Sequence, residues 1–208
     1  MNNGKIKKLA LLTGGGDCPG LNSAIRAVVQ VCTLEYDIQV VGIPDGFKGL
    51  LENKFVPLDL FNTTGIFARG GTMLGSSNVD TPFSVPVNKG GKRIYEDRSD
   101  EVMEHLARER VDAMIVVGGD GTQAIAHGMA QKGLKVVGIP KTIDNDLNGT
   151  EMTIGFHTAV TTAVDAKGYE TSFTYDALGR PWKTFFPDAR IRHRSSTVSR
   201  IRVSPWAM

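Results

Sequence analysis

Short apolar runs alternate with helix-patterned segments along most of the chain. Four runs, each ended by glycine, proline or a polar turn, predict buried strands. They span residues 8–13, 38–43, 113–117 and 134–139. Apolar residues with helical spacing predict helices between and after these strands. These helices span residues 21–32, about 99–110 and about 123–132, with a further helix starting near 153 and running to about 166. The alternation predicts an α/β fold, a Rossmann-like parallel sheet with helices on both faces.

Two local details sharpen this prediction. Ser99 precedes an apolar face formed by Val102, Met103 and Leu106, so we expect it to cap that helix. Val-Val-Gly-Ile-Pro occurs at both 40–44 and 136–140. A true repeat is one interpretation, and two buried strands with similar ends is the safer one.

Composition places the chain among ordinary globular proteins. Its 208 residues suit one large domain, or one domain and part of a second. With only Cys18 and Cys32, a disulfide framework or a cysteine zinc site is not expected. That cysteine usage suits a reducing cytosol, and no apolar run reaches the length of a membrane span. We therefore expect a cytoplasmic protein with no membrane partner.

The net charge of +2 conceals an uneven distribution. Residues 167–208 hold eight Lys or Arg against three Asp or Glu, whereas the remainder is slightly acidic. A basic tail is one signature of nucleic-acid binding. We favour a solvated terminus instead and do not expect a nucleic-acid partner.

Three polar loops follow predicted strands, at residues 14–20, 118–122 and 140–146. Parallel sheets bind ligands at the carboxyl ends of their strands, so we expect these loops to share one edge. The first contains Gly14, Gly15 and Gly16, whose backbone amides can approach a phosphate. The second, Gly-Gly-Asp-Gly-Thr, places Asp120 among phosphate-facing amides. A carboxylate there makes sense with Mg²⁺ between it and the phosphates.

The third loop, Pro-Lys-Thr-Ile-Asp-Asn-Asp, is the sharpest chemical signal. One of its carboxylates, Asp144 or Asp146, can accept a proton from a hydroxyl, and the other can orient a neighbour or a metal-bound water. Lys141 can neutralise phosphate charge. A polar turn without catalytic role is the alternative. The chain has no Gly-x4-Gly-Lys-Ser/Thr motif, so ATP, if used, is held without that lysine.

Together these segments resemble the phosphofructokinase family. The matching stretches are residues 12–22, 70–76, 118–122, 140–146 and 154–159, and the resemblance covers about residues 5–166. It implies a two-domain α/β subunit, usually tetrameric, that transfers a phosphoryl group from ATP to the 1-hydroxyl of fructose 6-phosphate in glycolysis.

The resemblance also implies residue roles. Asp144 would be the general base, and Asp120 would bind Mg²⁺. We count Lys141 with Asp144 as catalytic, because its charge can neutralise phosphate. Thr142, Asp144 and Asp146 would face the sugar phosphate. The donor phosphates would lie along Gly15, Gly16, Gly119, Asp120, Gly121 and Thr122.

Two positions bear on the choice between ATP and pyrophosphate as donor. Pyrophosphate users in the family often have Asp after Gly-Gly-Asp, where it would crowd the α-phosphate of ATP; here Gly121 leaves room. They also tend to have Lys where this chain has Lys141. We weight Gly121 more and expect ATP, with pyrophosphate as the alternative. Asn78 stands where many ATP users have Arg, and Lys141 is our candidate for the missing charge.

The resemblance ends near residue 166. We therefore expect a donor and catalytic domain over 1–166, an atypical basic tail over 167–208 that is either disordered or frameshifted, and a second domain that is largely missing. A truncated or frameshifted chain is favoured over a genuine short form, and we expect little kinase activity from this chain alone. An NAD-kinase-like or lipid-kinase-like enzyme and a non-catalytic nucleotide-binding remnant are the competing interpretations.

Overall fold

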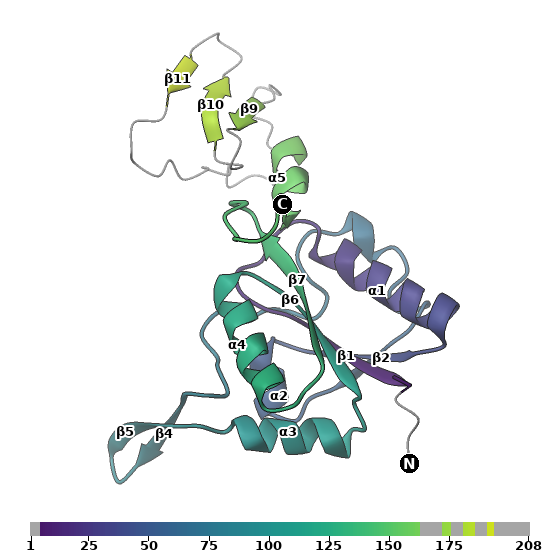
Figure 1. The fold of residues 1–208 in the computed structure, drawn as a ribbon, viewed down its shortest axis with the longest axis vertical. Coiled ribbons are helices and arrows are strands. Elements are labelled where there is room, and N and C mark those ends of the chain that lie inside the picture. Colours follow the sequence, from purple (N-terminus) through teal and green to yellow (C-terminus); the bar gives the residue numbers. More distant parts are fainter. Residues whose placement is uncertain (1–4, 163–171, 176–180, 186–190, 194–208) are drawn as a thin grey trace.

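A six-stranded sheet forms the centre of the computed structural model, which describes residues 5–162, 172–175, 181–185 and 191–193 (Figure 1). Its strand order is β3-β2-β1-β6-β7-β8, and all neighbours are parallel except β2 and β3. The strands are β1 (Lys8–Thr13), β2 (Gln39–Ile43), β3 (Val56–Leu58), β6 (Ala113–Gly118), β7 (Val136–Thr142) and β8 (Ile154–Gly155).

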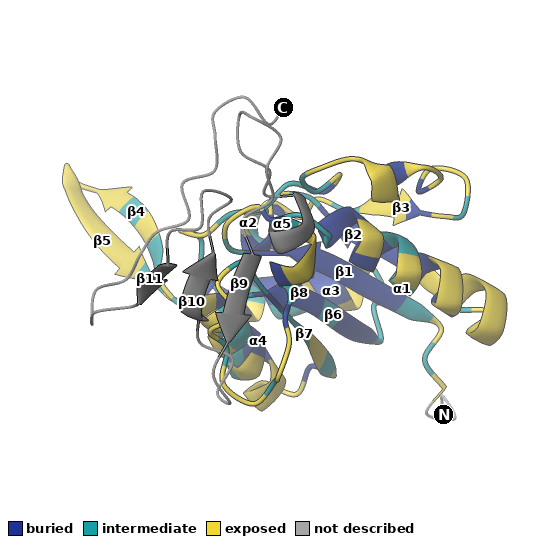
Figure 2. Ribbon diagram, turned by 90° about the horizontal axis from the view of Figure 1, so that it is seen from above, coloured by how far each residue is buried: buried dark blue, intermediate teal, exposed yellow. Residues whose placement is uncertain are grey.

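Helices cover both faces of this sheet, as the sequence predicts. Along β1, Leu9 and Leu11 pack with α1 (Leu21–Tyr36) and the short 3-10 helix η1 (Ile66–Ala68). Ala10 and Leu12 point to the opposite face, because successive side chains in a strand alternate. That face is covered by α2 (Phe47–Leu51), α3 (Ser99–Arg108) and α4 (Asp120–Gln131), and the central strands are buried (Figure 2).

Several element ends differ from their predicted positions. Helix α1 continues to Tyr36, and α4 begins at Asp120, three residues earlier than expected. The predicted cap of α3 is wrong: Ser99 is its first residue, and Asp97 Oδ1 accepts hydrogen bonds from the Ser99 backbone N–H (2.8 Å) and hydroxyl (2.5 Å). These bonds lower the pKa of Asp97, since they favour its charged form.

The two Val-Val-Gly-Ile-Pro segments have different surroundings. In the first, Val40 and Val41 on β2 are buried between neighbouring strands. In the second, Val137 on β7 is 60% exposed. Strand β8 pairs only with Lys141 and Thr142, so the rest of β7 forms an edge of the sheet among the described residues. The interpretation as two buried strands is therefore wrong for the second copy.

Strand β7 also begins and ends later than its predicted range of 134–139, and runs to Thr142. The segment predicted as a helix from 153 starts instead with β8, and the helix α5 spans Phe156–Thr162. Residues 163–166 of that prediction lie outside the described residues.

Among the described strands, two smaller sheets are not hydrogen-bonded to the central one. Strands β4 (Val85–Lys89) and β5 (Lys92–Glu96) form a hairpin that extends away from the sheet in Figures 1 and 2. Strands β9 (Ser172–Tyr175), β10 (Pro181–Phe185) and β11 (Ile191–His193) form an antiparallel sheet where the sequence pattern predicts no regular element. The rest of 167–208 lies outside the described residues. Within the described part, no helix has the length and apolarity to cross a membrane.

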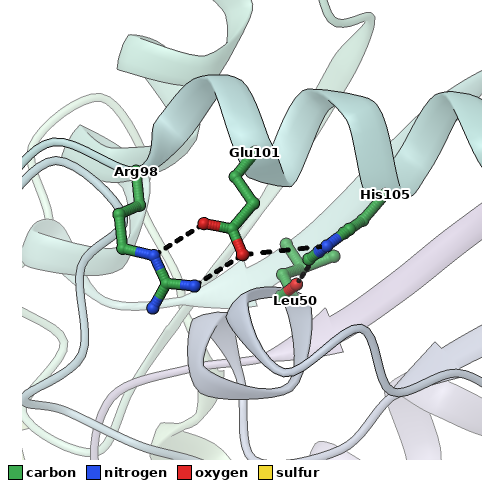
Figure 3. A network of polar contacts seen from close by, with 4 residues as sticks. All are labelled: Leu50, Arg98, Glu101 and His105. Carbon is green, nitrogen blue, oxygen red and sulfur yellow. Dashed lines mark hydrogen bonds and ion pairs between the residues drawn. The ribbon is translucent and has the colours of Figure 1, made fainter.

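A polar network fixes α3 against α2 (Figure 3). Arg98 donates to both carboxylate oxygens of Glu101, at 2.6 and 2.5 Å, and these bonds lower the pKa of Glu101. One turn later, His105 Nδ1 lies 2.8 Å from the carbonyl oxygen of Leu50. A carbonyl only accepts, so Nδ1 carries the proton in this contact. The His105 contact therefore joins α3 to α2 on the face of the sheet that both helices cover.

Candidate active site

The three predicted loops meet at one edge of the sheet. Strand β6 lies between β1 and β7, with Thr13 opposite Val117 and Gly118 opposite Pro140. All three strands are parallel, so the loops that follow them begin side by side. The expectation that residues 14–20, 118–122 and 140–146 share an edge is confirmed.

The first loop is fastened by its own backbone. The Gly14 N–H donates to the Val117 carbonyl oxygen (2.9 Å), and the Gly15 N–H donates to the Ser77 carbonyl oxygen (3.0 Å). A side chain at Gly14 would meet buried Thr122, since a Cβ there would lie 2.6 Å from Thr122 Cγ2. Glycine is thus required where the first and second loops touch.

The second loop leads directly into α4. Gly119 has extended backbone, and Asp120 and Gly121 are the first, exposed residues of the helix. The first backbone amides of a helix have no partner within it and carry positive dipole character, which favours an anion. Asp120 brings a carboxylate to the same place. The predicted donor-side residues Gly119, Asp120, Gly121 and Thr122 are therefore gathered at one helix N-terminus.

A pocket of about 290 Å³ opens beside this helix N-terminus. Its lining combines glycines, hydroxyl and carboxylate groups with apolar side chains. The lining residues are Gly15, Phe47, Ser77, Asn78, Val79, Asp80, Thr81, Gly119, Asp120, Gly121, Thr122 and Ile125. Mixed polar and apolar walls of this kind suit a small ligand with both kinds of surface.

The third loop is held in shape by its own side chains. Thr142 Oγ1 accepts from the Asp144 N–H and donates to Asp146 Oδ1, both at 3.1 Å. Asn145, with φ of 50°, accepts from the Thr153 N–H at 2.9 Å. The Thr153 hydroxyl also lies 2.9 Å from the Thr142 carbonyl oxygen. These contacts leave the side chains of Asp144 and Asp146 exposed at the loop surface.

Lys141 joins the third loop to the first. Its side chain is 4% exposed, and Nζ donates a hydrogen bond to the Gly16 carbonyl oxygen. Nearby, burial raises the pKa of the Cys18 thiol, and the positive charge of Lys141 opposes part of that rise. Among residues 5–162, no hydrogen bond or ion pair joins Asp144 to Lys141 or to Asp120.

Sequence reasoning missed three residues that shape this edge. Gln123 Nε2 lies 3.1 Å from the carbonyl oxygens of Gly118 and Ile139, and so bridges β6 and β7. Buried Asn22 donates to Arg69 and accepts from Met73, which holds the 69–73 loop over α1. Asp80 lies in the pocket and accepts a hydrogen bond from Ser77. Only the position of Gln123 directly after the Gly-Gly-Asp-Gly-Thr loop hints at such a role.

The residues at this edge fit a magnesium ion that is bound jointly by the protein and by the phosphates of a ligand. Within the described ranges, no group of three or more His, Cys, Asp or Glu forms a metal cage. Mg²⁺ is commonly held by one or two carboxylates together with substrate phosphates and water. Asp120, an exposed carboxylate at an anion-attracting helix terminus, meets that requirement.

A largely parallel α/β sheet whose adjacent loops bring together glycine amides, a buried lysine and three carboxylates defines a Rossmann-like domain. The family model for phosphofructokinase matches residues 8–171, and the chain belongs to the phosphofructokinase family.

Curated relatives agree with this assignment. The chain is 51% identical to ATP-dependent 6-phosphofructokinase 2 of Clostridium perfringens over 77% of its own length and 44% of that protein. It is 43% identical to ATP-dependent 6-phosphofructokinase 1 of Synechocystis over 78% of its own length and 45% of that protein. The chain thus spans about half the length of the curated relatives it matches.

Solved structures agree with the fold. The phosphofructokinase of Pichia pastoris in the T-state superposes with a TM-score of 0.64 and 26% identity, over 82% of this chain and 19% of that one. A pyrophosphate-dependent phosphofructokinase from Marinobacter aquaeolei, at 20% identity and a TM-score of 0.59, covers 73% of this chain and 37% of its own. This second likeness concerns the fold alone.

Proposed function

We propose that this chain provides the donor-phosphate site and the catalytic loop of a 6-phosphofructokinase, which transfers a phosphoryl group from ATP to the 1-hydroxyl of fructose 6-phosphate in glycolysis. The observation that carries the proposal is the convergence of Lys141, Gly16 and the α4 N-terminus on one sheet edge. Phosphoryl transfer depends mainly on positioning and charge neutralisation, and this edge offers both.

The donor phosphates would lie along Gly15, Gly16 and the first turn of α4. Backbone amides from Gly119 to Thr122 would face their oxygens, and Asp120 would hold Mg²⁺, which neutralises the phosphate charge when bound. Buried Lys141 adds a fixed positive charge at the junction of the loops. Many ATP users in the family have an arginine at the position of Asn78. The charge of Lys141 supports our interpretation that this lysine takes the place of that arginine.

Asp144 is the proposed general base. Its backbone is held by the Thr142 hydroxyl while its carboxylate stays exposed, so it can accept the proton of an incoming hydroxyl. A positioned base contributes roughly 10²–10⁴-fold to rate. Thr142 and Asp146, which hydrogen-bond to each other, would face the sugar phosphate on the same loop.

The structure supports ATP over pyrophosphate as donor. A Cβ on Gly121 would have no atom within 4 Å, so the space beside Asp120 is open where an Asp side chain would otherwise project. The pocket also has apolar walls, from Phe47, Val79 and Ile125, which suit a nucleoside and are of no use to pyrophosphate. The curated relatives described above are named ATP-dependent. A cytoplasmic location and a homo-oligomer, tetrameric in the family, complete the proposal.

Calorimetry on the 208-residue chain tests the donor site. We expect MgATP to bind, Asp120→Asn to weaken that binding, and Asp100→Asn, a change on the exposed side of α3, to leave it unaltered. Binding of magnesium pyrophosphate without MgATP would favour the pyrophosphate-dependent alternative.

Transfer is tested separately. Fructose 6-phosphate-dependent formation of ADP by this chain alone should be slow, and Asp144→Asn should lower it by a further roughly 10²–10⁴-fold while MgATP affinity stays the same. ATP binding with no transfer at all would instead support the nucleotide-binding remnant. Transfer to NAD in place of the sugar phosphate would contradict the proposal.

A further inference from the structure

Asp80 is connected to the first glycine loop through Ser77, which hydrogen-bonds to both. The Ser77 carbonyl oxygen accepts from the Gly15 N–H at 3.0 Å, so Ser77 is fixed to the first glycine loop. The Ser77 hydroxyl then donates to Asp80 Oδ2 and accepts from the Val79 N–H at 3.4 Å. Asp80 is therefore oriented by a residue that itself touches the predicted donor loop.

The carboxylate of Asp80 has unused hydrogen-bonding capacity in the pocket. Asp80 and Asp120 both line it. Among the described residues, Asp80 Oδ2 accepts from Ser77, and Oδ1 accepts from none. An ionised carboxylate accepts several hydrogen bonds and donates none. Asp80 thus selects for a ligand that brings hydroxyl or amine donors to this part of the pocket.

A phosphate is a poor neighbour for Asp80, because like charges repel at short range. Asp120 sits at a helix N-terminus and would share Mg²⁺ with the phosphates, whereas Asp80 lies on the 77–81 loop without either compensation. In a nucleotide the group next to the phosphates is the ribose, whose vicinal hydroxyls are donors. A carboxylate that accepts from ribose hydroxyls is a common device of nucleotide sites.

We propose that Asp80 accepts hydrogen bonds from the ribose hydroxyls of the donor and so selects a nucleotide over an inorganic polyphosphate. This inference rests on the proposed function, because it assumes that the phosphates lie along the glycine loops. It adds a residue of the 77–81 loop that would determine donor specificity, in the part of the donor pocket that would hold the ribose.

The test uses the full chain and three magnesium-loaded probes: ATP, 2′,3′-dideoxy-ATP and tripolyphosphate. In the wild-type chain we expect ATP to bind about tenfold more tightly than the dideoxy analogue, as loss of a charge-assisted hydrogen bond predicts. Asp80→Ala should remove this preference and should bind tripolyphosphate at least as tightly as the wild type. Glu35→Ala, which removes an exposed carboxylate at the far end of α1, is the matched control and should keep the preference.

The outcomes separate this inference from the proposed function. Equal binding of ATP and the dideoxy analogue by the wild type overturns the role of Asp80 but leaves the phosphate site standing. An equal loss for all three probes in Asp80→Ala also overturns it, and assigns Asp80 to cation binding. If neither ATP nor tripolyphosphate binds, the proposed function fails and this inference with it. Asp80→Asn keeps an acceptor for Ser77, so a reduced preference in that variant supports the proposal even if Asp80→Ala is unstable.

Discussion

The ammonium group of Lys141 donates a hydrogen bond to the carbonyl oxygen of Gly16, a residue 125 positions earlier in the chain. One side chain thereby connects the loop proposed to carry the base with the loop proposed to hold the donor. Lys141 is almost fully buried, so its charge acts in a less polar environment than bulk water. The contact makes the two halves of the proposed site mechanically and electrostatically dependent on each other.

Replacing Lys141 by Met should weaken MgATP binding by about tenfold or more, since a bond to a charged group contributes about 1.5–3 kcal/mol. Met keeps most of the apolar stem, so the far-ultraviolet circular dichroism should not change. Calorimetry measures the affinity, and Lys48→Met, an exposed lysine of α2, serves as the control. Unaltered ATP affinity in Lys141→Met would show that the lysine does not act on the donor.

Gly121→Asp should lower the affinity for MgATP by about tenfold or more, because it places a second carboxylate beside Asp120 in open space. The fold should tolerate the change, since glycine costs about 1 kcal/mol in a helix and acidic residues suit a helix N-terminus. Gly121→Ala separates charge from volume and should retain ATP binding. If Gly121→Asp binds ATP like the wild type, the open space at residue 121 does not explain the preference for ATP.

Gln123→Leu should destabilise the chain by about 1–3 kcal/mol and also weaken ATP binding. The variant keeps the side-chain volume but removes the amide that bridges the Gly118 and Ile139 carbonyl oxygens. Urea unfolding measures the stability, with Gln30→Leu on the exposed side of α1 as the control. A loss of stability without any loss of ATP affinity would confine Gln123 to a structural role.

The hydrogen bonds of Asp112 predict how the stability of the fold depends on pH. Its carboxylate accepts from the backbone N–H groups of Lys7 (2.7 Å) and Lys8 (3.0 Å), and these bonds lower its pKa. A lowered folded-state pKa stabilises the fold above the ordinary value of about 3.9, and this contribution disappears as the pH falls through the lowered value.

Asp112→Asn should therefore be less stable than the wild type at pH 7, by less than about 1 kcal/mol because the group is partly exposed. The two urea midpoints should converge as the pH falls below about 3.9. Glu104→Gln, an exposed change on α3, should show no such convergence. A difference that stays constant from pH 7 into acid would mean that the amide bonds of Asp112 do not depend on its charge.

Much of the architecture follows from local patterns. The apolar run of β1 and the glycine stop after it are visible in the sequence, and β1 has the predicted bounds. Three glycine-rich or acidic loops after strands suffice to predict that these loops share one edge of the sheet, because parallel strands bring their carboxyl ends together. The motifs within those loops also indicate the family, which the family model confirms over residues 8–171.

Other features depend on contacts between distant segments and were beyond local reasoning. Identical Val-Val-Gly-Ile-Pro segments differ in burial, because β2 has a partner on each side while most of β7 has only β6. Ser99 does not cap α3, because it is the first residue of the helix and its hydroxyl donates to Asp97. The sequence by itself determined four strands of the central sheet, the loops that follow them and the family, since periodicity and glycine act locally. Only the tertiary structure decided that Lys141 reaches Gly16 and that Asp80 enters the pocket, because packing alone brings residues of separate segments within hydrogen-bond distance.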